Sequence, residues 1–149
     1  QIFLPHSPSN ISTYLKRMDK FFQLASANDL PIFKIRNHPL PGSPNKNLIL
    51  FNQIENLILK FKNKFSNENS TKTSISLGGT SAVVEGLERG IKVIHIVDDE
   101  VFEAHDSFFW NGLTSKKIFE GVYEYKLTKK SFFIEFGKEN SLLKEYISK

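Results

Sequence analysis

Cysteine is absent from the chain, so neither a disulfide framework nor a thiolate metal site can form. Long apolar runs are lacking as well, and none approaches the roughly 20 residues that a membrane-spanning helix needs. Lysine and arginine are scattered, without the long basic block that is typical of a nucleic-acid-binding tail. These absences disfavour thiol chemistry, a membrane-spanning role and nucleic acid as a partner.

What is present is the composition of an ordinary globular domain. The 149 residues are 40% hydrophobic and 24% charged, which suits a single domain over residues 1–149 with a substantial core. The net charge of +4 predicts a solvated basic surface, or else a face turned toward an anionic ligand or membrane. Because the chain opens on an apolar strand with neither an initiator Met nor a signal-peptide pattern, we expect a fragment of a longer protein.

Short apolar runs alternate with amphipathic segments, which is the pattern of successive β-α-β units. Strands are expected at residues 2–5, 31–36, 73–77, 91–97 and 122–127, and helices at 11–27, 47–65 and 80–89. The pattern then weakens, and a loop with a short helix is expected over 98–113 and closing helices over 128–148. The sequence predicts an α/β fold, a Rossmann-like open parallel sheet with helices on both faces.

Polar or Gly- and Pro-rich loops follow four of the expected strands. The carboxyl ends of parallel strands meet at one edge of the sheet, and ligands of open α/β sheets bind in the crevice at that edge. The loops are therefore candidates for a binding site. Their chemically useful residues are Ser7, Ser9 and Asn10 in the first loop, Arg36 and His38 in the second, Gly78, Gly79, Thr80 and Ser81 in the third, and Asp98, Asp99 and Glu100 in the fourth.

The third loop has the pattern of an anion site. Gly78 and Gly79 let a ligand approach the backbone closely, and the following residues open a helix whose first amide groups have no partner within the helix. The helix dipole attracts phosphate, and Thr80 and Ser81 can donate hydroxyl hydrogen bonds to it. A glycine turn with a Thr or Ser N-cap and no ligand explains the same residues equally well.

Two further side chains fit a nucleotide. Glu85 lies one helical turn beyond Ser81, so its carboxylate can accept both hydroxyls of a ribose, and the alternative is a solvated helix residue. His38 follows Arg36 at a strand end and precedes Pro39, which stiffens the loop. An imidazolium at this place can contact a phosphate and stabilise a departing nucleotide, although a lone histidine is more often a surface or packing residue.

The remaining histidines and the single tryptophan carry weaker signals. His95 lies inside an expected strand and is interpreted as a core residue, and His6 is a weak candidate. His105 stands near acidic residues, but no ligand spacing supports a metal site there, so no metal is expected. Trp110 is interpreted as a core or interdomain side chain, with stacking on a base as the alternative.

The run SLGGTSAVVEGLERGIKVI, from Ser76 to Ile94, resembles the signature of the C-terminal domains of GT-B glycosyltransferases. In that family a turn of small residues and a Ser or Thr precede a helix that ends in a Glu-Ala-Leu-x-x-Gly-x-Pro-Val-Ile pattern. This chain has Gly86 in place of the Ala and Lys92 in place of the Pro. The Glu, the Gly that ends the helix and the following strand are kept.

The run RNHP, residues 36–39, resembles the His-Pro motif of bacterial sialyltransferases, capsule Kdo transferases and teichoic-acid polymerases, which use cytidine-nucleotide donors. The likeness covers roughly residues 1–127 in element order, and only the two motifs are specific. It implies these roles: His38 as the catalytic residue and phosphate contact, Arg36, Gly78, Gly79, Thr80 and Ser81 around the donor phosphates, Glu85 at the ribose, and Ser7, Ser9 and Asn10 facing the donor.

The resemblance also implies a function for the whole protein. The chain is expected to be the donor-binding C-terminal half of a GT-B glycosyltransferase in bacterial surface-polysaccharide biosynthesis, such as capsule synthesis, in the cytoplasm or at the inner face of the membrane. Its partners would be a CMP- or UDP-linked nucleotide sugar, an N-terminal Rossmann domain of the same polypeptide and a glycan acceptor, with no cofactor. The alternatives are a GT-B-type sugar-nucleotide epimerase or hydrolase, and a non-catalytic Rossmann-like nucleotide-binding or interaction domain.

Overall fold

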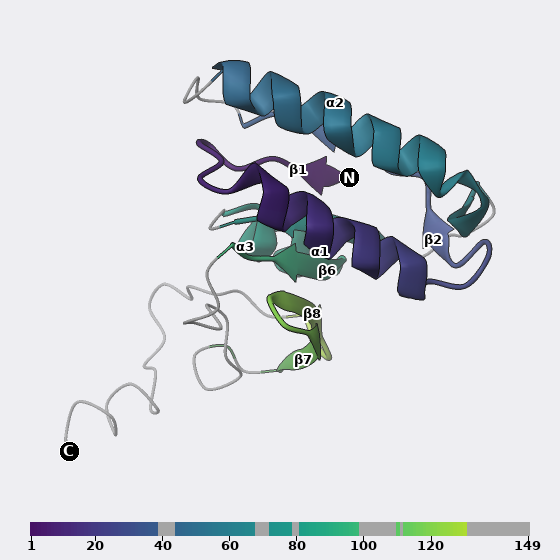
Figure 1. The fold of residues 1–149 in the computed structure, drawn as a ribbon. Helices are drawn as coiled ribbons and strands as arrows, with labels where there is room; N and C mark the ends of the chain where they lie inside the picture. Colours follow the sequence, from purple (N-terminus) through teal and green to yellow (C-terminus); the bar gives the residue numbers. More distant parts are fainter. Residues whose placement is uncertain (39–43, 68–71, 79–80, 99–109, 111, 131–149) are drawn as a thin grey trace.

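The computed structural model describes residues 1–38, 44–67, 72–78, 81–98, 110 and 112–130. A six-stranded sheet forms the centre of this part of the chain (Figure 1). Its strands are β1 (Ile2–Phe3), β3 (Ile35–Arg36), β5 (Thr73–Leu77), β6 (Lys92–Ile96), β7 (Leu113–Phe119) and β8 (Val122–Leu127). They lie side by side in the order β3-β1-β5-β6-β8-β7.

The sheet is parallel in its first four strands and antiparallel at its end. β3, β1, β5 and β6 pair in parallel, whereas β8 runs antiparallel to β6 and β7 antiparallel to β8. The prediction of a parallel sheet is therefore wrong for the last two strands. The physical reason is the two-residue turn at 120–121, in which Gly121 has a φ of 73°, because so short a connection can join only antiparallel neighbours.

A second, two-stranded sheet lies beside the first. It pairs β2 (Leu30–Pro31) with β4 (Phe65–Ser66) in parallel. The strand expected over 31–36 is thus two strands, β2 and β3, in different sheets. Pro31 has no amide hydrogen to donate, which suits the end of a short edge strand better than the middle of a long one.

Within the described part of the chain, three α-helices accompany the sheets. They are α1 (Ile11–Leu24), α2 (Pro44–Lys60) and α3 (Ala82–Glu88), and a short 3-10 helix follows α2 at Lys62–Lys64. The helices predicted at 11–27, 47–65 and 80–89 are found, with ends that differ by a few residues. Gly90 closes α3 as expected, since its φ is 71° and its amide donates to the carbonyl of Leu87 at 2.9 Å.

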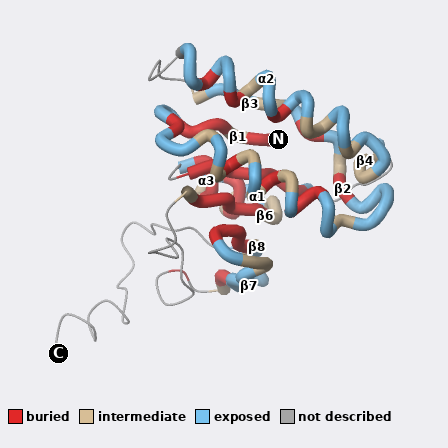
Figure 2. Tube along the Cα trace, viewed as in Figure 1, coloured by how far each residue is buried: buried red, intermediate tan, exposed pale blue. Residues whose placement is uncertain are grey.

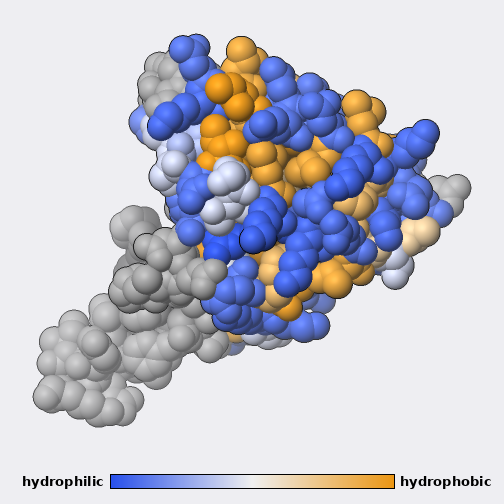
Figure 3. All heavy atoms as spheres, viewed as in Figure 1, coloured by the Kyte–Doolittle hydropathy of each residue, from blue (hydrophilic) through white to orange (hydrophobic). Residues whose placement is uncertain are grey.

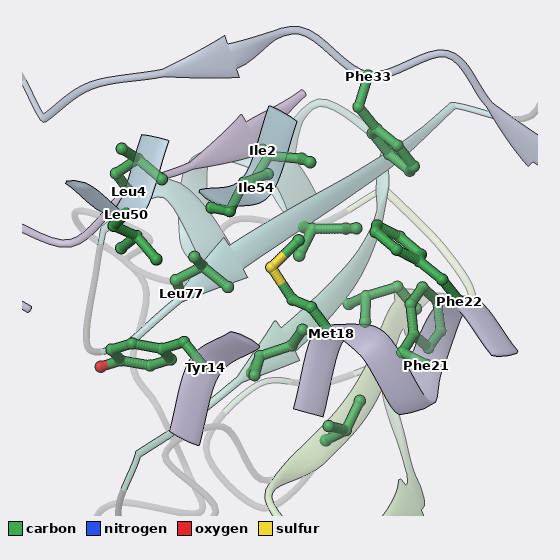
Figure 4. Close-up of a cluster of buried hydrophobic side chains, with 14 of the residues drawn as sticks. Ile2, Leu4, Tyr14, Met18, Phe21, Phe22, Phe33, Leu50, Ile54 and Leu77 are labelled. Atoms are coloured by element: carbon green, nitrogen blue, oxygen red, sulfur yellow. The ribbon is translucent and has the colours of Figure 1, made fainter. Parts of the chain in front are cut away.

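The helices cover both faces of the sheet, as predicted. α1 and α2 pack on one face through an apolar cluster that includes Met18, Phe22 and Ile54 (Figure 4). α3 packs on the other face, where Val83 and Leu87 meet side chains of β6, β7 and β8. Strand β6 contributes side chains to both clusters, because alternate side chains of a strand point to opposite faces of the sheet. Figure 2 shows the central strands buried between these layers.

The outer surface of the helices is mostly hydrophilic, with apolar side chains between the charged ones (Figure 3). The large hydrophobic residues exposed on the described part of the chain are Leu24, Ile32, Leu48, Ile49 and Leu59. Within the same residues, none of the helices combines the length and the hydropathy that a membrane span requires. The loop and helices expected over 98–113 and 128–148 lie almost wholly outside the described residues.

Candidate functional site

The order of the strands reverses beside β1. The chain passes from β1 to β3 on one side and then to β5 on the other side. Ligands of open α/β sheets bind beyond the carboxyl ends of the strands at such a reversal. Because β3, β1, β5 and β6 are parallel, the loops that follow them all begin at one edge of the sheet, which we call the carboxyl edge.

The first and second loops meet at this edge in a pair of imidazole rings. The rings of His6 and His38 lie edge to face, with their centroids 5.1 Å apart and their planes at 81°. The carbonyl oxygen of His6 accepts a hydrogen bond of 3.3 Å from Nδ2 of Asn47 on α2, and Ser7 Oγ lies 3.4 Å from His6 Nδ1. The candidates Ser7 and His38 are therefore close to each other, joined through a histidine that the sequence pattern did not favour.

The other end of the first loop is tied to the loop after β6. Ser9 Oγ donates a hydrogen bond to Oδ2 of Asp98, and the hydroxyl of Tyr14 on α1 also hydrogen-bonds to Asp98. Figure 4 shows the buried Tyr14 ring within the apolar cluster and its hydroxyl pointing away from that cluster. Burial raises the pKa of Tyr14 above its usual range, and the negative charge of Asp98 raises it further.

Gly78 follows the last residue of β5 and lies beside the Tyr14 hydroxyl and Pro5. Its φ is 67°, and a Cβ atom placed on it would lie 2.6 Å from the Tyr14 hydroxyl and 3.4 Å from Cβ of Pro5. Its amide donates to the carbonyl of Ile96 at 2.8 Å, and its carbonyl lies 2.9 Å from Nε2 of His95. The local backbone thus needs a glycine at this position for conformation and for space.

The rest of the predicted phosphate loop is described only in part. Gly79 and Thr80 lie outside the described residues. Ser81 immediately precedes α3 with helical dihedral angles and forms no side-chain hydrogen bond to the helix end. The helix therefore begins at the carboxyl edge, where the resemblance requires it, and the contact of Ser81 with a phosphate stays a prediction.

Asn10 has a structural role in the first loop. Its Oδ1 accepts hydrogen bonds from the amide of Thr13 at 3.2 Å and from Ser12 Oγ at 2.8 Å, so it is the N-cap of α1. Asn is among the residue types preferred at this position, so the N-cap role explains Asn10 without a ligand. In the first loop, Ser9 is bonded to Asp98 and Asn10 to the start of α1, whereas Ser7 lies beside the imidazole of His6.

Glu85 lies away from the imidazole pair. Its Oε1 atom forms an ion pair of 2.5 Å with Nη2 of Arg89, one turn further along α3, and its side chain is 57% exposed. It lines two cavities, of about 750 and 190 Å³, on the flanks of α3. The smaller cavity is also lined by Gln1 and Lys72, which precede β1 and β5, so it opens near the amino ends of these strands.

The charge of Arg36 acts on the amino group at the start of the chain. The N-terminal amino group of Gln1 has a lowered pKa, first because it is partly buried and second because the positive charge of Arg36 is near. Gln1 precedes β1, whereas His38 follows the carboxyl end of β3. The structure thus brings His38, Ser7 and Gly78 to the carboxyl edge, whereas Glu85 is held in an ion pair with Arg89 on the flank of α3.

The other residues that the sequence singled out are buried or undescribed. His95 is 2% exposed within β6, which confirms it as a core residue, and Trp110 is 2% exposed in the cluster under α3. His105 lies outside the described residues. Within the described ranges, no group of three or more His, Asp or Glu side chains is arranged to hold a metal ion.

In comparisons with known proteins, no family model, curated protein or solved structure matches the chain. The function must therefore be argued from the carboxyl edge itself. This edge offers two imidazoles, a glycine turn leading to a helix, and a carboxylate held by two hydroxyl groups. Such a set is suited to binding a ligand that carries both a phosphate and hydroxyl groups.

Replacing Tyr14 with phenylalanine tests the bond between α1 and Asp98. At pH 7 the free energy of unfolding should fall by about 1.5 kcal/mol, the lower end of the range for a hydrogen bond to a charged group. A raised pKa in the folded state means that the unfolded chain ionises first, so wild-type stability should decline as the pH rises above about 10. The Tyr14→Phe variant has no phenol to ionise at this position. The difference in free energy of unfolding between the two proteins should therefore narrow as the pH rises.

Urea unfolding at pH 7 and at pH 10.5, followed by circular dichroism, measures both effects. If the difference in free energy of unfolding between wild type and Tyr14→Phe is the same at both pH values, Tyr14 is not protected from ionisation in the folded protein.

Proposed function

We propose that the chain is the nucleotide-sugar-binding half of a GT-B-fold glycosyltransferase. The observation that carries the proposal is the position of His38, which follows a parallel strand next to the strand-order reversal and contacts the loop after β1. Gly78 and the start of α3 lie at the same edge. A His-Pro motif and a glycine turn that opens a helix are far apart in the sequence, so their arrangement on one sheet edge supports a common ligand.

In this proposal the donor phosphates are bound between His38 and the start of α3. The imidazole donates a hydrogen bond to a phosphate oxygen, and the amides of the first turn of α3 face the same group with the positive end of the helix dipole. As the bond from the sugar to the nucleotide breaks, negative charge grows on the leaving phosphate. A protonated His38 stabilises that charge more in the transition state than in the ground state.

The ribose contact of Glu85 requires a rearrangement. Its carboxylate is paired with Arg89, so binding of two ribose hydroxyls needs that ion pair to open. The pair is exposed, and exposed pairs of this kind contribute only a few tenths of a kcal/mol, about 0.3–0.5 for neighbours one helical turn apart. Opening the ion pair therefore costs little free energy, and the Glu85 side chain must in addition turn from the flank of α3 toward the carboxyl edge.

An N-terminal Rossmann domain of the same polypeptide would supply the acceptor site and the general base. Leu48 and Ile49 are exposed in the first turns of α2, and Asn47 beside them bonds to His6 at the carboxyl edge. Exposed apolar residues at this edge suit contact with a second domain. By itself the chain should bind a CMP- or UDP-linked donor weakly and should transfer no sugar. The corresponding biological role is surface-polysaccharide synthesis, such as capsule synthesis, at the cytoplasmic side of the membrane.

A thermal-shift panel of cytidine, uridine and guanosine mono- and diphosphates tests the proposal. A ligand at ten times its dissociation constant stabilises the folded state by about 1.4 kcal/mol, which corresponds to roughly 3–6 °C in Tm for a domain of this size. We expect such a shift for at least one pyrimidine nucleotide, and a smaller one or none for the matching nucleosides, which lack phosphate.

The same panel separates the alternatives. No shift with any nucleotide at 10 mM would favour a non-catalytic interaction domain. If nucleotides do bind, assays of the complete protein with a nucleotide sugar distinguish transfer to a glycan from epimerisation or hydrolysis.

A further inference from the structure

We propose that His6 and His38 act as a pair that binds one phosphate group, so that His6 is a second phosphate-binding residue of the site. Binding of a phosphate group by the two imidazoles follows from the geometry of the pair alone. Its extension to the phosphate of a nucleotide sugar rests on the proposed function.

The pair is built from two loops that are held in place independently. His6 follows Pro5, whose side chain is packed near Gly78, and the carbonyl of His6 is held by Asn47 of α2. His38 lies two residues beyond β3. The rings meet edge to face at 5.1 Å, and His6 is exposed while His38 is half-buried, so solutes reach the pair from solvent.

The chemistry of two imidazoles at this separation favours an anion. Each ring can donate an N–H group, and a hydrogen bond spans about 2.9 Å, so donors on two neighbouring rings can reach different oxygens of one phosphate. When both rings are protonated they repel each other, and a bound phosphate dianion replaces that repulsion with two attractions. Within the described residues no set of three or more His, Asp or Glu side chains accompanies the pair as metal ligands, which favours phosphate over a cation.

The position of the pair supports the same ligand. It lies at the carboxyl ends of β1 and β3, next to the place where the strand order reverses. The hydroxyl of Ser7 is 3.4 Å from His6 Nδ1 and gives the site a third polar group. A phosphate bound there would be contacted from the loops after two adjacent strands.

Titration with inorganic phosphate tests the pair directly. In two-dimensional NMR spectra of the imidazole nitrogens, we expect the resonances of both His6 and His38 to shift along one saturation curve, while those of buried His95 stay in place. His6→Ala should weaken phosphate binding about tenfold, as measured by calorimetry, with little change in Tm because His6 is exposed. Lys16→Ala is the matched control, since it removes one exposed positive charge from α1 and should leave the affinity unchanged.

Two results would overturn the proposal: a His6 resonance that does not move while phosphate binds, or equal losses of affinity in His6→Ala and Lys16→Ala, which would indicate diffuse electrostatic attraction. The two proposals fail separately. If phosphate binds through both rings and no nucleotide binds, the phosphate-binding role of the pair is supported and the donor site is refuted. Nucleotide binding that leaves His6 unmoved and the His6→Ala affinity intact would keep the donor site and refute the pair.

Discussion

Replacing Gly78 with alanine should lower the free energy of unfolding by about 2–5 kcal/mol. A left-handed backbone conformation costs an L-residue roughly 1–2 kcal/mol, and Gly78 has a φ of 67°. The new methyl group would also lie 2.6 Å from the Tyr14 hydroxyl, and overpacking of a buried side chain adds about 1–3 kcal/mol. Tyr14 is buried and bonded to Asp98, so its ring has little freedom to move aside.

Gly90→Ala is the matched control for this experiment. Gly90 has nearly the same backbone conformation, with a φ of 71°, but among the described residues no neighbouring atom lies within 4 Å of a Cβ placed on it. It should therefore show the backbone cost of about 1–2 kcal/mol alone. Urea unfolding of both variants separates the two contributions. Equal losses would mean that the contact between Gly78 and Tyr14 carries no strain, and that Gly78 is required only for its dihedral angles.

A double variant refines the result. In Tyr14→Phe the hydroxyl that the new methyl group would meet is gone, so Gly78→Ala should cost less in that background than in the wild type. The difference between the two costs measures the contact itself. If the cost is the same in both backgrounds, the strain comes from another neighbour, and Cβ of Pro5, at 3.4 Å, is the next atom to test.

The elements that the sequence predicted well are those with strong local patterns. The strand over 73–77 is found with the same bounds. Asn10 caps the start of α1 and Gly90 closes the end of α3, as their residue types suggest. Strand β8 is found at the predicted residues 122–127, but its hairpin partner β7 was not predicted, because β7 is an edge strand. Its exposed Ser115, Lys116 and Lys117 interrupt the alternation that marks a half-buried strand.

The candidate site was predictable only in its position. Parallel strands bring their carboxyl ends together, so the motifs around His38 and Gly78 could be assigned to one edge. The contacts within that edge depend on packing between distant segments. Ser9 and Asp98 are 89 residues apart, and Tyr14 could be recognised only as an apolar position of α1, since its hydroxyl adds nothing to the periodicity. The spacing of Glu85 and Arg89, four residues apart on a helix, is typical of an ion pair, but it does not show whether a ligand would displace that pair.

Under the proposed function, replacing His38 with alanine in the complete protein should reduce the kcat of sugar transfer by about a hundred- to a thousandfold. Removal of one preorganised group that stabilises developing charge costs about 2.7–4 kcal/mol in the barrier. The effect should appear mainly in kcat, because the charge on the departing nucleotide is larger in the transition state than in the bound donor. Asn37→Ala serves as the control, since it changes the exposed neighbouring side chain and keeps the imidazole.

The separate effects of His38→Ala on kcat and on KM show whether the imidazole catalyses or only binds the donor. A higher KM with an unchanged kcat would mean that the imidazole holds the donor equally well in the ground state and in the transition state, so that it binds without catalysing. Near-normal values of both would remove His38 from the site, and the His-Pro motif would then be only a stiff turn after β3. Because His38 lies 5.1 Å from His6 at the ring centroids, the loss in His38→Ala should also be smaller when His6 is already replaced, as expected for groups that act on one phosphate.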